Sequence, residues 1–164
     1  MATITSFKFD TADGAEQMLD LVKELSKQQL ITLQDAAIVT WPQGKKKPKT
    51  RQLESLTGAG ALSGAFWGML FGLIFFVPFF GMAVGAAMGA LTGKFSDYGI
   101  DDDFIKSVGQ QVTEGTSALF LMTSDAVVDK VSEAVKAKGW NFELLSTNLS
   151  KEQEDQLRMD FGAE

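Results

Sequence analysis

Clusters of carboxylates are the side chains in this sequence that could do chemistry. Asp101, Asp102 and Asp103 are consecutive, and carboxylate oxygens are the ligands that Mg²⁺ and Ca²⁺ prefer. Three consecutive residues at a helix start point in different directions, however, and no loop of suitably spaced oxygen ligands follows. Negative charge is favoured at that end of a helix dipole. Asp13 and Glu16, three positions apart, likewise fit a capping box. We therefore expect helix capping at both places, and no metal site.

The groups on which most enzymes rely are missing. The chain has no histidine and no cysteine, which removes the commonest general base, the commonest transition-metal ligand and any thiolate zinc site. Gly44 and Lys45 to Lys47 lack the glycine spacing of a phosphate-binding loop. A net charge of −6 argues against a nucleic-acid partner. We expect a protein that is not an enzyme and that uses no cofactor.

Residues 1–54 are predicted to form a first β-α-β unit followed by a basic loop. Residues 3–9 alternate between polar and apolar types, which is typical of a strand and not of a signal peptide. Apolar residues then recur at helical spacing from Asp13 to about Leu30. Residues 36–41 predict a buried strand that ends at Pro42 and Gly44.

Residues 96–149 are predicted to contain a helix and a second β-α-β unit. The helix runs from Asp102 to about Glu114, and residues 117–122 form a short apolar strand. Ser124 caps a helix that Gly139 ends, and residues 140–146 are the returning strand. A charged helix occupies residues 150–164. Two such units predict an α+β fold, a ferredoxin-like split β-α-β sandwich with four antiparallel strands and helices on one face.

An uncharged segment with regularly spaced glycines separates the two units. Residues 55–93 carry no charge, and eight of their glycines fall into two series at four-residue spacing. Eight helical glycines would cost on the order of 8 kcal/mol relative to alanine, so close helix packing must offset them. We therefore predict a glycine-zipper helical hairpin over residues 55–95. The helix-packing residues are Gly60, Gly64, Gly68, Gly72, Gly81, Gly85, Gly89 and Gly93.

The hairpin is predicted to enter lipid or the centre of an oligomer. The alternative is a helical hairpin buried inside the core of a soluble domain. The apolar side chains that point away from the glycines would need lipid or a partner subunit to cover them; they are Phe66, Trp67, Leu70, Phe71, Leu73 and Ile74. The first arm, Thr57 to Val77, could span about 30 Å, and the second is shorter. Both a full span and a shallow wedge therefore stay open. The hairpin apex contains Phe75, Phe76, Pro78, Phe79 and Phe80.

Basic residues flank both ends of this segment. By the positive-inside rule they place that side in the cytosol, so we expect both termini there. The same residues could contact anionic lipid headgroups, although a solvated basic loop explains them equally well. They are Lys45, Lys46, Lys47, Lys49, Arg51 and Lys94.

Residues 60–122 resemble the bacterial membrane-protein family catalogued as domain of unknown function 1269. The similarity lies in the sequence Gly-Ala-Phe-Trp-Gly at 64–68, in Pro78 and Gly81, and in the segments 97–106 and 115–120. The resemblance implies a protein of the bacterial inner membrane, and it supplies no catalytic residues.

Three functional hypotheses follow. The first is a homo-oligomeric protein whose hairpin inserts in the bilayer, with a structural, membrane-remodelling or permeability role. The second is a soluble cytoplasmic particle in which the hairpins bury one another. The third is a ligand-sensing regulatory module anchored by the hairpin. A water-filled pore is the weaker version of the first, because only Ser63 and Thr92 are polar between Gly58 and Gly93.

Overall fold

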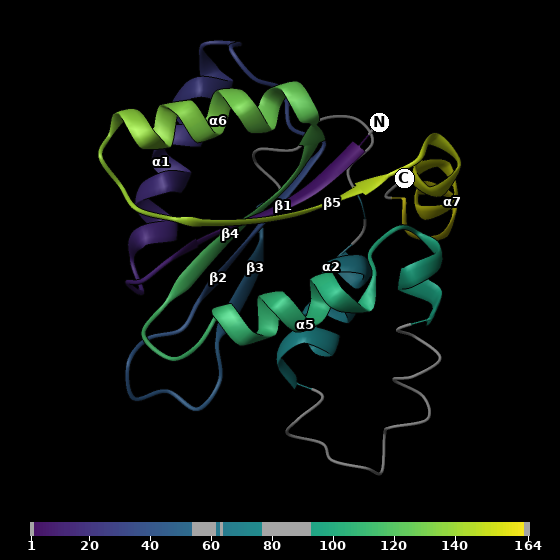
Figure 1. Ribbon diagram of the computed structural model, residues 1–164, viewed down its shortest axis with the longest axis horizontal. Coiled ribbons are helices and arrows are strands. Elements are labelled where there is room, and N and C mark those ends of the chain that lie inside the picture. Colours follow the sequence, from purple (N-terminus) through teal and green to yellow (C-terminus); the bar gives the residue numbers. More distant parts are fainter. Residues whose placement is uncertain (1, 54–61, 63, 77–92, 163–164) are drawn as a thin grey trace.

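The computed structural model describes residues 2–53, 62, 64–76 and 93–162. Its helices and strands follow one another along the chain as two β-α-β units separated by a helical segment (Figure 1). In order they are β1 (Ala2–Phe9), α1 (Gly14–Lys27), β2 (Asp35–Thr40), β3 (Lys49–Gln52), α2 (Gly64–Phe71), the π-helix η2 (Gly72–Phe76), α5 (Asp102–Gln111), β4 (Ser117–Ser124), α6 (Asp125–Ala137), β5 (Glu143–Leu149) and α7 (Lys151–Phe161).

The strands form one antiparallel sheet of five strands, in the order β3-β2-β4-β1-β5. The predicted α+β class is confirmed, but the expected number of four strands is wrong. The fifth strand, β3, comes from residues that we expected in a basic loop. Lys49 pairs with Thr40 and Arg51 pairs with Ile38, so both cations lie on an edge strand.

Helices cover both faces of the sheet, and not one face as expected. Helices α1 and α6 lie on one side, and α2, η2 and α5 lie on the other (Figure 1). Side chains that alternate along the strands enter two separate cores: Leu119 packs toward α1 and α6, whereas Phe120 packs toward α2. Every residue of β1 is buried, because both of its faces are covered.

The aromatic face of α2 supplies the second core, which corrects the prediction that this face needs lipid or a partner subunit. Phe66, Trp67, Leu70 and Phe71 are at most 2% exposed. The ring of Phe71 meets Phe120 of β4 edge-on, with centroids 5.2 Å apart. The residues identified as outward-facing are therefore packed against the sheet of their own chain.

Helix caps agree only partly with the sequence. Asp101 caps α5 by accepting a hydrogen bond of 2.9 Å from Phe104 N, and Ser150 forms a capping box with Gln153. The predicted capping box at Asp13 is wrong, since the Asp13 side chain makes no capping hydrogen bond and Glu16 instead pairs with Arg51 at 3.4 Å.

The predicted long helical hairpin is not seen in the part of the chain that the structure describes. The first arm contains α2, which passes into the π-helix η2 at Gly72. Most of the second arm and of the apex lies outside the described residues. Within those residues, no helix has both the length and the apolar character needed to cross a membrane.

Candidate functional site

The glycine stripe of α2 lies on the face opposite its aromatic side chains. Gly64 and Gly68 are exposed and Gly72 is partly exposed, with Ala65 and Met69 beside them. Apart from its chain neighbours and the backbone of its own helix, a Cβ atom built on Gly68 or Gly72 would meet no described atom within 4 Å. The predicted small-residue surface therefore exists and is open within the described chain.

The remaining glycines of the two series are less informative. Gly93 lies in a helix whose described part is residues 93–97, and a Cβ there would also meet open space among the described residues. Gly60, Gly81, Gly85 and Gly89 lie outside the described residues.

A buried carboxylate fixes the start of the helical segment to the sheet. Asp35 of β2 is fully buried, and its Oδ2 accepts a hydrogen bond of 2.8 Å from Leu62 N. Gln52 of β3 donates from Nε2 to Leu62 O at 2.9 Å and to Asp35 Oδ1 at 3.3 Å. Asp35 Oδ1 also accepts from Ala36 N at 2.8 Å. Because burying a carboxylate is costly unless donors surround it, these bonds tie the segment firmly to β2.

An aromatic cluster holds the other end of the segment against α2. Phe95 packs 5.7 Å from Phe66 and stacks on Phe161 of α7 at 6.2 Å, measured between ring centroids. Phe66 in turn meets Phe161 at 5.9 Å. The helices on either side of residues 77–92 are thus joined directly to one another and to the C-terminal helix.

Tyr98 adds a polar contact to this cluster. It is almost fully buried and donates a hydrogen bond to Asp160. Burial, followed by the hydrogen bond to Asp160, raises the pKa of Tyr98 well above its usual value. The hydrogen bond from Tyr98 and a second one from Gln156 lower the pKa of Asp160.

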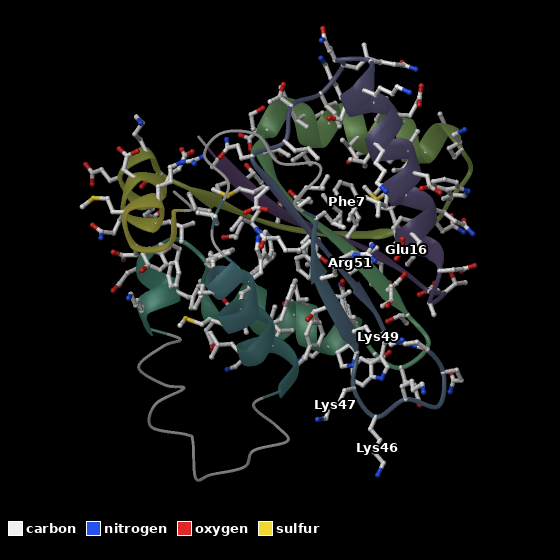
Figure 2. All side chains as sticks on the ribbon, turned by 180° about the vertical axis from the view of Figure 1, so that it is seen from behind. Phe7, Glu16, Lys46, Lys47, Lys49 and Arg51 are labelled. Carbon is white, nitrogen blue, oxygen red and sulfur yellow. The ribbon has the colours of Figure 1, made fainter. Side chains whose placement is uncertain are left out.

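The basic loop between β2 and β3 is held next to the end of η2. Trp41 follows β2, and its Nε1 donates to Lys45 O at 2.8 Å. The Trp41 ring meets Phe75 edge-on, with centroids 6.4 Å apart. Figure 2 shows Lys46 and Lys47 directed away from the sheet at the tip of this loop. The structure thus brings lysines together with the point at which the uncharged segment leaves η2.

The six basic residues of the prediction lie in three places: the loop after β2, strand β3, and the helix that contains Lys94. Lys45, Lys46 and Lys47 are exposed in the loop. Arg51 is turned toward Glu16 of α1, as Figure 2 shows. Lys94 lies on the other flank, with Nζ 5.6 Å from the centre of the Phe161 ring.

The predicted hairpin apex is only partly described. Phe75 is 4% exposed and packs against Trp41 and Phe71 of its own chain. Phe76 ends η2, whereas Pro78, Phe79 and Phe80 lie outside the described residues.

The described residues offer little for metal chemistry. No group of three or more carboxylates among them is arranged to hold a metal ion. Asp102 instead pairs with Lys106 at 2.8 Å along α5, and this contact raises the pKa of Lys106.

Residues 61–162 match the family described as Protein of unknown function (DUF1269). The chain belongs to the DUF1269 family. No curated protein and no solved structure matches it. The DUF1269 match continues through β4, α6, β5 and α7, beyond the residues that first suggested the resemblance. It leaves out β1 and β2, although β4 lies between these two strands in the sheet.

Sequence reasoning missed the residues that attach Leu62 and the helices α2 and η2 to the sheet. Asp35 precedes an apolar strand and resembles an ordinary turn residue, and Gln52 was assigned to a loop. Trp41 was expected to end a buried strand, and no pattern in the sequence marked its contact with Phe75.

Proposed function

We propose that this DUF1269 protein is a non-enzymatic, homo-oligomeric, membrane-associated protein with a structural or membrane-remodelling role. In this proposal residues 77–92 enter the bilayer, and the sheet domain stays at its surface. The basic loop contacts anionic headgroups, and the exposed glycine stripe of α2 packs against another copy.

The contact between Trp41 and Phe75 carries the membrane part of the proposal. It joins the loop bearing Lys45, Lys46 and Lys47 to the end of η2, where residues 77–92 begin. Residues 55–93 are free of charge, so a headgroup-binding loop and an apolar segment are adjacent. Each lysine near an anionic surface contributes about 1 kcal/mol to binding.

We further propose that the segment is a shallow wedge. The aromatic face of α2 is buried in the core of its own chain, so this helix is unavailable to lipid while it is docked. Residues 77–92 are fewer than the about 20 that one membrane-crossing helix requires. Insertion of these residues alone therefore favours the wedge over the full span.

The fold is proposed to be a split β-α-β sandwich with an added edge strand. Without β3, the strand order is β2-β4-β1-β5, and α1 and α6 connect the strands on one face. This order supports the ferredoxin-like arrangement. The second helical layer, of α2, η2 and α5, is then an addition that lies between the two β-α-β units in the sequence.

Vesicle flotation tests the membrane part. Full-length protein is mixed with neutral vesicles and with vesicles containing an anionic phospholipid. A variant with Lys45, Lys46 and Lys47 replaced by glutamine should bind anionic vesicles on the order of 100-fold more weakly. The matched control replaces the exposed Lys23, Lys136 and Lys138 of the opposite helical layer, which gives the same net charge. Equal binding by both triple variants would argue against the proposal.

A second candidate function is a soluble assembly in which the glycine stripes pack together. The observation that favours it is that α2 already buries its aromatic face inside the chain, leaving the stripe open. Ultracentrifugation of detergent-free cell extracts distinguishes the membrane-associated protein from the soluble assembly. A membrane pellet that resists carbonate supports the first, and a large discrete soluble particle supports the second.

A further inference from the structure

The two edges of the sheet differ in their protection against pairing. At one edge, β3 has four residues, carries Lys49 and Arg51, and follows Pro48. Lysines, prolines and short length are the usual protections of an edge strand. At the other edge, β5 has the sequence Glu-Leu-Leu-Ser-Thr-Asn-Leu, in which Glu143 is the one charge. The β5 edge has none of the protections that β3 has.

The backbone of β5 has free hydrogen-bonding groups at this edge. Trp41 N donates to Thr116 O at 2.9 Å, and the alternation of an antiparallel ladder can be followed from this bond across β4 and β1. In such a ladder, the backbone groups of successive residues point to opposite neighbouring strands. In β5, the backbone N–H and C=O groups of Leu144, Ser146 and Asn148 therefore point away from β1. Among the described residues, no hydrogen bond outside the sheet engages these groups.

Only part of this edge is open. A Cβ atom on Gly99 would lie 3.0 Å from Asn148 O, so the segment around Gly99 covers the end of β5. Leu144 is 42% exposed and Leu145 is half-buried. Thr147 Oγ1 also donates a hydrogen bond to Gly99 O, so this segment reaches Thr147. Among the described residues, the accessible stretch is therefore residues 143–146, which combine unpaired backbone groups with two leucines.

We infer that the β5 edge joins two copies of the chain, with the two β5 strands antiparallel. Pairing of Leu144 with Ser146 of the second copy uses outward-directed backbone groups of both strands. It places the two Leu145 side chains opposite each other and Glu143 opposite a threonine, so no like charges face each other. The same surface serves both copies, as a closed two-fold dimer requires.

This inference rests on the homo-oligomer of the proposed function, but it does not depend on lipid. It assigns the contact between the sheet domains of two copies, whereas the glycine stripe of the proposed function joins their α2 helices. The alternative occupant is the β3 edge of another copy, which would bring Lys49 near Glu143. That contact is head-to-tail and would produce an open-ended series of species.

Light scattering after size-exclusion chromatography of the full-length chain tests the inference. Ser146→Pro removes an outward N–H that the sheet does not use, and Leu144→Lys adds an edge charge. Each should halve the mass of the assembly while thermal unfolding remains cooperative. Thr50→Pro, the matched change on β3, should leave the mass unchanged. The inference would be overturned by any of three results. The wild type could be a monomer, or the folded β5 variants could keep the mass of the wild type. The wild type could also form a growing series of species that Thr50→Pro abolishes.

Hydrogen exchange gives a test that needs no substitution. The amides of Leu144 and Ser146 should exchange more slowly as the wild-type concentration rises, whereas the amide of Thr50 should not change. Equal exchange of the β5 amides at all concentrations would overturn the inference. An intact dimer that fails to bind anionic vesicles would count against the membrane part of the proposed function alone.

Discussion

The carboxylate of Asp35 accepts a hydrogen bond of 2.8 Å from the backbone N–H of Leu62, and Asp35 is fully buried. The bond connects β2 to the residue just before α2. Gln52 reinforces it by donating to the carbonyl of Leu62. The helical segment is therefore attached to the sheet by polar contacts as well as by its aromatic face.

Asp35→Ala should lower the free energy of unfolding by about 1–3 kcal/mol, because it leaves the buried N–H groups of Leu62 and Ala36 without their acceptor. Urea denaturation measures this change. Asp20→Ala, on the exposed face of α1, is the control and should change stability little. If Asp35→Ala changed the free energy of unfolding as little as Asp20→Ala does, water would be replacing the carboxylate at no cost.

Tyr98 should ionise only far above the pH at which an exposed tyrosine does. Its pKa is raised, so the folded state keeps the phenol proton that the unfolded state releases near pH 10. Stability should therefore be unaffected by this group below pH 10 and should fall as the pH rises above it. Tyr98 is the single tyrosine of the chain, so phenolate absorbance reports on it alone.

The absorbance titration has an internal control in denaturant, where Tyr98 should titrate at about pH 10. Tyr98→Phe should remove the alkaline loss of stability that this group causes. Native protein whose phenolate appears at the same pH as in denaturant would contradict the buried hydrogen bond to Asp160.

The order and type of most elements followed from sequence periodicity, but the edges of the sheet did not. β3 has the sequence Lys-Thr-Arg-Gln, whose cations protect an edge and conceal the strand. The returning strand was expected at residues 140–146 and lies at Glu143–Leu149. Trp140 and Phe142 pack against the core beneath α1 and α6 ahead of the strand, so their apolar character did not mark its start.

The orientation of α2 could not be predicted from its residue types. Phe66, Trp67 and Phe71 would suit lipid and a protein core equally well, since both environments select large apolar side chains. The aromatic face of α2 packs on the sheet and not against lipid because α1 and α6 cover only one face of the sheet. The other face needs an apolar cover, which α2 provides. Gly64 and Gly68, in contrast, are exposed and Gly72 is partly exposed, and their role in helix packing stays a prediction.

Gly68→Leu should lower the mass of the assembly without unfolding the chain. Apart from its chain neighbours and the backbone of its own helix, no described atom lies within 4 Å of a Cβ at Gly68. A leucine there therefore meets no described side chain, and it would block close approach of another copy. Gly85→Leu should act in the same way if the two glycine series pack together. Light scattering measures the mass.

Two controls make the Gly68 result specific. Gly68→Ala keeps a small residue and should raise stability by up to about 1 kcal/mol through helix propensity, with the mass unchanged. Gln17→Leu adds the same side chain to the exposed face of α1 and should not alter the mass. Unchanged assembly in both Gly68→Leu and Gly85→Leu would show that the glycine stripes do not join the subunits.

Trp41→Ala should weaken binding to anionic vesicles by about tenfold, or 1.4 kcal/mol. The substitution removes both the hydrogen bond to Lys45 O and the ring contact with Phe75, so the basic loop is no longer held beside η2. Trp41→Phe keeps a ring beside Phe75 but has no side-chain N–H to donate. Its binding to anionic vesicles should lie between that of Trp41→Ala and that of the wild type. Trp140→Ala, which alters a half-buried tryptophan near α6, is the matched control. If Trp41→Ala and Trp140→Ala bind as the wild type does, the loop reaches the membrane without the help of Trp41, and its lysines alone account for binding.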